Sequence, residues 1–195
     1  MSIGRPLQFD PEQALDTAMH VFWGRGYDAT SLQDLLQAMR LSKSSFYQAF
    51  GSKQQLFERC LRRYREQTAQ DLLARLDKLG SGRRFIAELL ESAVDEARSE
   101  QKPRGCLVMN TANEFAQRNP EVAAWVQQGV NRFKGIFETA VRRSQDQGEI
   151  PPERDPETLA LYLVSSMSGI KTLVKAGLDD QSAERIVGVI LSALD

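Results

Sequence analysis

A segment of twenty residues, from Ser31 to Phe50, constrains the fold of this chain more than any other part of its sequence. The segment has the pattern of two short helices joined by a tight turn, with Ser42 at the start of the second helix. That second helix is polar and basic in its first turn and ends on aromatic residues, Phe46 and Phe50. Such a helix can place its first turn in a DNA major groove while its far side packs on a small core. We therefore predict a helix-turn-helix over about residues 31–50.

Helix signals continue along the rest of the chain, and no convincing alternation of a β-strand appears. Asp10-Pro11 begins a first helix, and Ser52 begins a long helix that ends near Gly80. Prolines and glycines divide the remainder into five further helices, expected at about 83–99, 105–117, 120–147, 156–176 and 181–194. The sequence therefore predicts an all-α protein of about nine helices.

The composition is that of an ordinary soluble protein, with 42% hydrophobic and 26% charged residues in 195. No window approaches the roughly 18 unbroken apolar residues of a membrane helix. The first ten residues lack the apolar core of a signal peptide, so we expect a cytoplasmic protein without a membrane partner. Cys60 and Cys106 lie far apart, which argues against a disulfide scaffold or a zinc site. We expect no metal site and no cofactor.

The charges are segregated, although the net charge is only −1. Between Arg40 and Arg65 there are seven basic residues and a single acidic one, Glu58. A local positive field of this kind attracts a polyanion whatever the net charge of the whole protein. A basic helix face that is simply solvated is an equally open interpretation.

Polar residues at two helix starts suit contacts with DNA phosphates. Thr30 and Ser31 bring hydroxyl and backbone N–H groups to a helix N-terminus, where a phosphate binds well. Lys53 lies in the first turn of its helix, where a cation opposes the helix dipole. A bound phosphate would remove that conflict.

The start of the helix after Ser42 suits contacts with bases as well. Lys43, Ser44 and Ser45 occupy its first turn, and serine hydroxyls reach phosphates or base edges of either kind. Gln48, one turn further on, can pair bidentately with adenine in the major groove. Phe46 and Phe50 should face inward.

The segment from Asp10 to Phe57 resembles the DNA-binding domain of the TetR (tetracycline repressor) family of bacterial transcription regulators. The resemblance depends on Phe22, Gly26-Tyr27, Thr30-Ser31, Ser42-Lys43, Tyr47, Phe50, Ser52-Lys53 and Leu56-Phe57. The rest of the chain agrees in pattern, because it is helical, of suitable length and apolar in its last two helices. The resemblance implies a DNA-binding domain over 1–53 and a helical ligand-binding and dimerisation domain over 54–195.

The resemblance also implies a function, that of a homodimeric repressor released from a near-palindromic operator by an unknown small molecule. The implied partners are double-stranded DNA, a small-molecule effector and a second copy of the chain. The DNA contacts that it implies are Thr30, Lys43, Ser45, Tyr47, Gln48 and Lys53, with a further contact from Arg5. The implied dimer interface lies on the last two helices, for which we expect Leu159, Tyr162, Ser166, Gly169, Ile186, Val189, Ile190 and Ala193. A helix apolar on two faces can also be a central core helix, and that interpretation is equally open.

Aromatic residues of the sixth and seventh helices suggest a ligand cavity, although plain core is the commoner role of such a stripe. The expected cavity residues are Tyr64, Cys106, Met109, Asn113, Phe115, Trp125 and Phe133. Cys106 follows two cations and lies near a helix start, and both features lower the pKa of a thiol. It is therefore either a sensor of electrophiles or oxidants or a small packed residue.

Two departures from the family pattern concern the helix-turn-helix. Arg40 and Ser44 stand where family members often have glycine, and a left-handed Arg40 would cost about 1 kcal/mol. These departures leave open a helical ligand-binding or adaptor protein that does not bind DNA. An enzyme is disfavoured, because the chain has one histidine, His20, and neither a phosphate-binding glycine loop nor metal-ligand spacing. Carboxylates such as Glu91 and Glu96 are interpreted as a solvated helix face.

Overall fold

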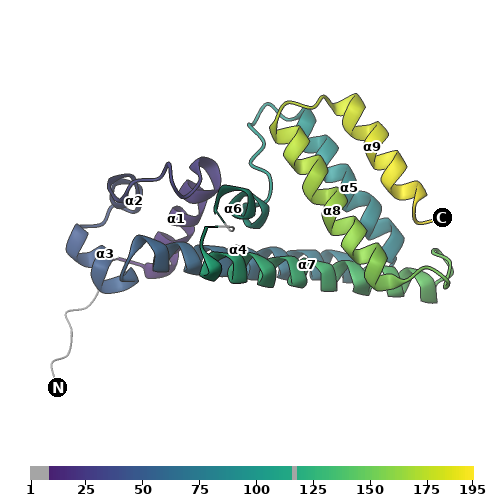
Figure 1. The fold of residues 1–195 in the computed structure, drawn as a ribbon, viewed down its shortest axis with the longest axis horizontal. Helices are drawn as coiled ribbons and strands as arrows, with labels where there is room; N and C mark the ends of the chain where they lie inside the picture. Colours follow the sequence, from purple (N-terminus) through teal and green to yellow (C-terminus); the bar gives the residue numbers. More distant parts are fainter. Residues whose placement is uncertain (1–8, 116–117) are drawn as a thin grey trace, which may run out of the picture.

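In the computed structural model of the protein, residues 9–115 and 118–195 are described, and these ranges contain nine helices and no strand (Figure 1). The helices are α1 (Pro11–Arg25), α2 (Leu32–Met39), α3 (Lys43–Phe50), α4 (Lys53–Leu79), α5 (Gly82–Arg98), α6 (Leu107–Phe115), α7 (Pro120–Asp146), α8 (Pro156–Lys175) and α9 (Asp180–Ser192). The predicted all-α fold is confirmed, and the predicted helix positions differ from the observed ones by a few residues at most.

Side-chain caps fix the starts of the first three helices. The Asp10 carboxylate accepts hydrogen bonds from the backbone N–H groups of Glu12 and Gln13 at the start of α1. Ser31 and Asp34 form a reciprocal capping box at α2, and Ser42 caps α3. Each cap satisfies N–H groups that the first turn of a helix leaves without a backbone acceptor. These short-range contacts explain why the three short helices begin where the sequence predicts.

Two long helices, α4 and α7, pack side by side and form the long axis of the molecule (Figure 1). The unit of α1–α3, called here the head, lies at one end, and α5, α8 and α9 lie at the other. At that second end α5 approaches α7 very closely, since a Cβ atom on Gly82 would lie 1.9 Å from the carbonyl oxygen of Ala140. A residue with a side chain would force the two helices apart.

Buried side chains form two clusters, one beneath the head and one among α5 and α7–α9. The head cluster is built on Phe22, Phe46 and Phe57, and it continues into Val108 of α6 and Val122 of α7. The head is therefore packed against the rest of the chain rather than joined only through α4. No helix in the described ranges has the length and apolar character needed to cross a membrane.

Candidate functional site

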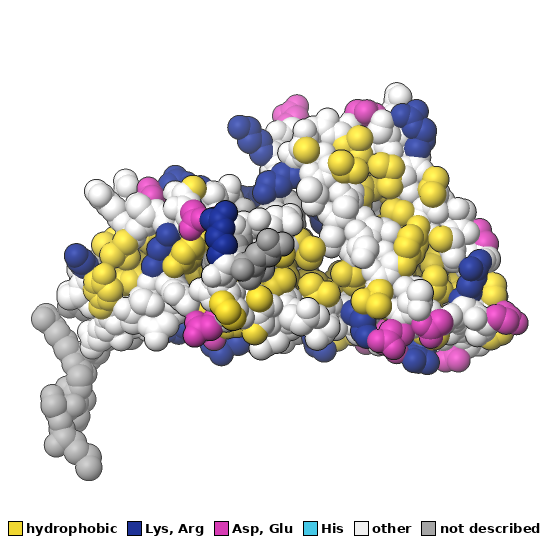
Figure 2. Space-filling model, viewed as in Figure 1, with side chains coloured by type: hydrophobic (Ala, Val, Ile, Leu, Met, Phe, Trp, Pro, Cys, Tyr) yellow, Lys and Arg dark blue, Asp and Glu magenta, His cyan; other side chains and the backbone are white. Residues whose placement is uncertain are grey.

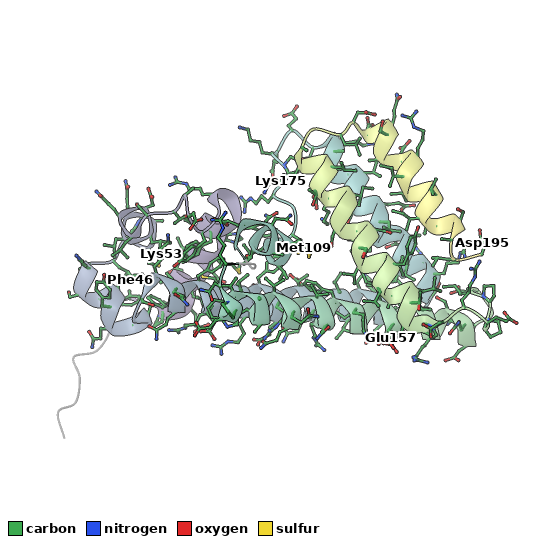
Figure 3. All side chains as sticks on the ribbon, viewed as in Figure 1. Phe46, Lys53, Met109, Glu157, Lys175 and Asp195 are labelled. Carbon is green, nitrogen blue, oxygen red and sulfur yellow. The ribbon has the colours of Figure 1, made fainter. Side chains whose placement is uncertain are left out.

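The exposed front of α3 carries the polar residues that the sequence singled out. Lys43, Ser44, Tyr47 and Gln48 are exposed, and 47% of the Tyr47 surface is open to solvent. The back of the helix is buried, with Phe46 (labelled in Figure 3) and Phe50 in the head cluster as predicted. The helix thus presents a polar, singly charged face outward from an aromatic anchor.

Hydroxyl groups crowd the N-terminus of α3. The Ser42 hydroxyl accepts a hydrogen bond from the backbone N–H of Ser45 at 3.1 Å. The same oxygen lies 3.0 Å from the Ser44 hydroxyl and 2.9 Å from that of Ser45. Together with the helix dipole, these groups make the start of α3 suitable for a phosphate oxygen.

The turn before α3 contains the left-handed residue that the sequence raised as a possibility. Arg40 has φ 55° and ψ 42°. Among the described residues it is the only one other than glycine with a positive φ. Its N–H donates to the carbonyl oxygens of Gln37 and Leu36, which closes α2. The strained turn joins α2 to α3 and leaves the Arg40 side chain exposed, at a hollow that Asp10 and Gln13 also line.

The structure corrects the role expected for Thr30. Its side chain is fully buried, and its hydroxyl donates to the carbonyl oxygen of Gly26 at 2.6 Å. Thr30 therefore holds the turn between α1 and α2 and does not present its side chain to DNA. Ser31 is exposed, but its hydroxyl is engaged with Asp34 in the capping box. The expected contact from Arg5 lies outside the described residues.

Lys53 is partly buried against Tyr27, in the turn between α1 and α2. Its ammonium group is 4.0 Å from the centroid of the Tyr27 ring. Partial burial lowers the pKa of Lys53, and the negative charges of Asp28 and Glu114 oppose this effect. A phosphate bound at the start of α4 would add a further anion near this lysine, as the dipole argument anticipated.

Part of the basic run from Arg40 to Arg65 stabilises the fold. Arg63 forms ion pairs with Asp16 and Glu12 of α1. Arg59 donates to the carbonyl oxygen of Ala49 at 2.9 Å and so covers the end of α3. The positive charge available to a polyanion near α3 is therefore smaller than the run suggests.

A cavity of about 210 Å³, called here the central cavity, lies where α4, α5, α6, α7 and α8 converge. Four expected residues line it, namely Tyr64, Cys106, Met109 and Phe133. Burial raises the pKa of the Tyr64 phenol well above its ordinary value, and the neighbouring Cys106 raises it further. The Cys60 thiol is buried in the head cluster, where desolvation raises its pKa far above that of a free thiol.

Other expected cavity residues lie elsewhere. Asn113 lines an open cleft between the head and the end of α8, and Trp125 lines a separate hollow beside Leu61 of α4. The apolar stripe of α7 is wide enough to face both the head cluster and the cavity, and Trp125 takes the head side. The side chain of Phe115 lies outside the described residues.

The polar or aromatic residues of the cavity that sequence reasoning missed include Trp23, Glu96 and Lys171. The Trp23 indole N–H donates to the carbonyl oxygen of Gly105 at 3.0 Å, which joins α1 to the segment before α6. Glu96 and Lys171 form an ion pair across α5 and α8. No local pattern marks this pair, because its members are far apart in sequence.

An apolar face is exposed on the last two helices (Figure 2). Leu161, Ser165, Gly169 and Leu173 recur every fourth residue of α8, and all four are exposed. On α9, 68% of the Val189 surface is exposed. Sequence reasoning missed the two leucines, although they share a helix face with Gly169.

Several residues expected at this face have other positions. The prediction that Leu159 and Ile190 lie at the dimer interface is wrong, because both side chains are buried in the core of the chain itself. Tyr162 and Ile186 are partly buried against that core. Ser166 and Ala193 are partly exposed.

A three-helix head that presents a polar helix over an aromatic anchor defines a helix-turn-helix DNA-binding protein. The family model "Bacterial regulatory proteins, tetR family" matches residues 14–60, and "Tetracyclin repressor-like, C-terminal domain" matches residues 82–190. The chain belongs to the TetR family of transcription regulators.

Individual relatives agree along nearly the whole chain. The uncharacterized regulator YezE of Bacillus subtilis is 31% identical over 99% of this chain and 100% of its own length. The transcriptional repressor ComR of Escherichia coli is 29% identical over 97% of this chain and 91% of its own. A solved structure of a cysteine mutant of CifR, complexed with 26 bp of double-strand operator DNA, has 32% identity and a TM-score of 0.85. That match covers 98% of this chain and 100% of CifR, and these relatives are regulators rather than enzymes.

Proposed function

We propose that this protein is a homodimeric transcriptional repressor that leaves a near-palindromic operator when a small molecule occupies the central cavity. The observation that carries the proposal is α3, whose exposed Lys43, Tyr47 and Gln48 are backed by buried Phe46 and Phe50. The names of two relatives support it, since ComR is described as a repressor and CifR was solved with operator DNA. Such a protein would act in the cytoplasm.

The exposed face of α8 and α9 supports pairing with a second copy. A contiguous apolar face on a soluble protein commonly marks an interaction site. In a symmetric dimer the same face of both copies would be covered, and the small side chains of Ser165 and Gly169 allow a close approach of helices. Two copies of α3 would then read successive major grooves, about 34–36 Å apart.

Helix α6 supports a connection between the central cavity and the head. The helix begins just after Cys106, which lines the cavity, and it carries Glu114 near its other end. The Glu114 carboxylate accepts hydrogen bonds from the backbone N–H groups of Tyr27 at 3.0 Å and Asp28 at 2.6 Å. A ligand that displaces α6 would therefore move the turn between α1 and α2, and with it the spacing of the two heads. To shift the populations of two conformations with different head spacings from 1:99 to 99:1, the ligand must bind one of them more tightly by about 5.5 kcal/mol.

The region upstream of the gene for this protein is the natural place to look for the operator. We expect the purified protein to protect an inverted repeat there from nuclease cleavage, with half-sites one helical turn or a multiple of it apart. Protection of DNA without any sequence preference would contradict the proposal. The absence of any protection at low salt would contradict it as well.

A thiol sensor of the same fold is a second candidate, favoured by the position of Cys106 in the cavity wall beside Tyr64. In this case an electrophile or oxidant that enters the cavity would modify the thiol and release the DNA. Substitution Cys106→Ser should abolish that release while leaving operator affinity unchanged. Release of equal size from the substituted protein would end this candidate.

A further inference from the structure

The central cavity has one charged pair in an otherwise uncharged wall. Lys171 of α8 donates to the Oε1 atom of Glu96 on α5, and both residues line the cavity. The Lys171 side chain is only 19% exposed, so the pair is partly withdrawn from water. The pair carries no net charge, which decides what kind of molecule can be accepted beside it.

The second carboxylate oxygen of Glu96 lacks a partner. Its Oε2 atom is closed off from solvent and has no hydrogen-bond donor among the described residues. A buried acceptor without a donor costs about 1–3 kcal/mol, and nearly all such groups in folded proteins are satisfied. Because Glu96 lines the cavity, a rotation of its carboxylate about the last side-chain bond would bring this oxygen to a bound molecule. A hydroxyl or N–H group on that molecule would then remove this cost.

The rest of the wall is mainly apolar, with Leu72, Leu89, Val130, Phe133 and Phe137 facing the space. A charged ligand would lose its hydration there and would find no unpaired opposite charge, because Glu96 and Lys171 neutralise each other. A neutral ligand escapes this penalty. The wall therefore favours a largely apolar body.

The volume sets the size of the molecule. The cavity measures about 210 Å³. An apolar protein cavity of roughly 150 Å³ binds benzene, which has six non-hydrogen atoms, so this one suits a compact molecule of about eight non-hydrogen atoms.

We propose that the central cavity binds a small, neutral, mainly apolar molecule with one hydroxyl or N–H group, and that this group donates to Glu96 Oε2. This inference rests on the proposed function, since the molecule would be the effector that releases the operator. Specificity would come from Glu96, because a site built around a hydrogen bond rejects an analogue that cannot make it.

Four probes of nearly equal shape test the inference on the DNA-free protein at neutral pH. They are 4-methylphenol, toluene, 4-methylanisole and 4-methylbenzoate, and binding is measured by ligand-observed NMR titration. We expect 4-methylphenol to bind at least about tenfold more tightly than the other three, because it alone is neutral and carries a donor. Equal affinities for 4-methylphenol and toluene would overturn the inference, and so would failure of every probe to bind or tighter binding of the benzoate.

The variant Glu96→Gln provides the reverse test. Its amide oxygen can still accept from Lys171, which turns the amide NH₂ group toward the position of Oε2. The cavity then offers a donor, and 4-methylanisole should bind at least as tightly as 4-methylphenol. The matched control Glu91→Gln, which changes an exposed carboxylate on the same helix, should keep the original order. An unchanged order in a folded Glu96→Gln protein would contradict the role of Glu96.

The outcome is separable from that of the proposed function, because no DNA is present in the probe titrations. If the protein binds an operator but the four probes do not bind in the expected order, the inference about the ligand is refuted and the proposed function is not. If the probes bind in the expected order but the protein shows no sequence-specific DNA binding, the proposed function is refuted and the inferred class of ligand stands.

Discussion

Single residues decide how the recognition helix is presented. Arg40 adopts left-handed backbone at the turn between α2 and α3, where glycine carries no steric cost. Its side chain is exposed and borders a hollow that Asp10 and Gln13 of the α1 start also line, so burial of the side chain does not offset this strain.

Substitution Arg40→Gly should stabilise the protein by about 0.5–1 kcal/mol, because the left-handed strain outweighs the entropy that glycine gains on unfolding. The variant Arg40→Ala keeps the strain and also removes the charge, so it should show no such gain. Urea unfolding curves of both variants measure the difference. Equal stability of the two variants would refute strain at this turn.

Helix α6 is the element on which communication between cavity and head would depend. Glu114 holds the turn of Tyr27 and Asp28 through two backbone hydrogen bonds, and Trp23 holds the segment before α6 through Gly105. These contacts tie both ends of a short helix to α1 and the turn that follows it. Movement at one end would therefore be felt in the head.

Substitution Glu114→Ala should destabilise the turn of Tyr27 and Asp28 by about 1–2 kcal/mol, since it removes the acceptor of two N–H groups. The loss should be local, with faster hydrogen exchange of the amides of Tyr27 and Asp28 and unchanged exchange in the middle of α7. The variant Glu114→Gln keeps an oxygen acceptor, so the exchange rates of these two amides should lie between those of the unsubstituted protein and those of Glu114→Ala. Uniformly faster exchange throughout the chain would mean that Glu114 stabilises the fold globally.

Local signals account for what the sequence predicted at the scale of elements. Caps such as Asp10, Ser31 and Ser42 act within one helical turn, so nearby residues suffice to place them. The direction in which an apolar side chain points depends on distant helices, so the sequence does not predict that Trp125 lies outside the central cavity or that Leu159 lies in the core. The sequence does not reveal the ion pair of Glu96 either, because Lys171 is seventy-five residues away.

The whole molecule would act as a pair of heads on one paired body. The exposed apolar face of α8 and α9 is the surface through which we expect two copies to meet. Two linked heads bind a palindrome far more tightly than one head does, because the second contact becomes intramolecular.

Substitution Leu161→Glu should therefore break the dimer without unfolding the chain, because Leu161 is 47% exposed. Sedimentation velocity should show a shift to the monomer mass of 21.9 kDa, together with a large loss of operator affinity. The control Gln70→Glu, on an exposed position of α4, should leave the dimer intact. A dimer that survives Leu161→Glu would place the interface elsewhere.

The salt dependence of duplex affinity tests most directly whether the front of α3 contacts DNA. We predict a steep fall of the logarithm of the binding constant with that of the salt concentration. Lys43→Ala should reduce the slope by about one for each head, whereas Lys78→Ala, which removes the same charge near the far end of α4, should leave it unchanged. A flat slope, or equal slopes for the two variants, would contradict the account.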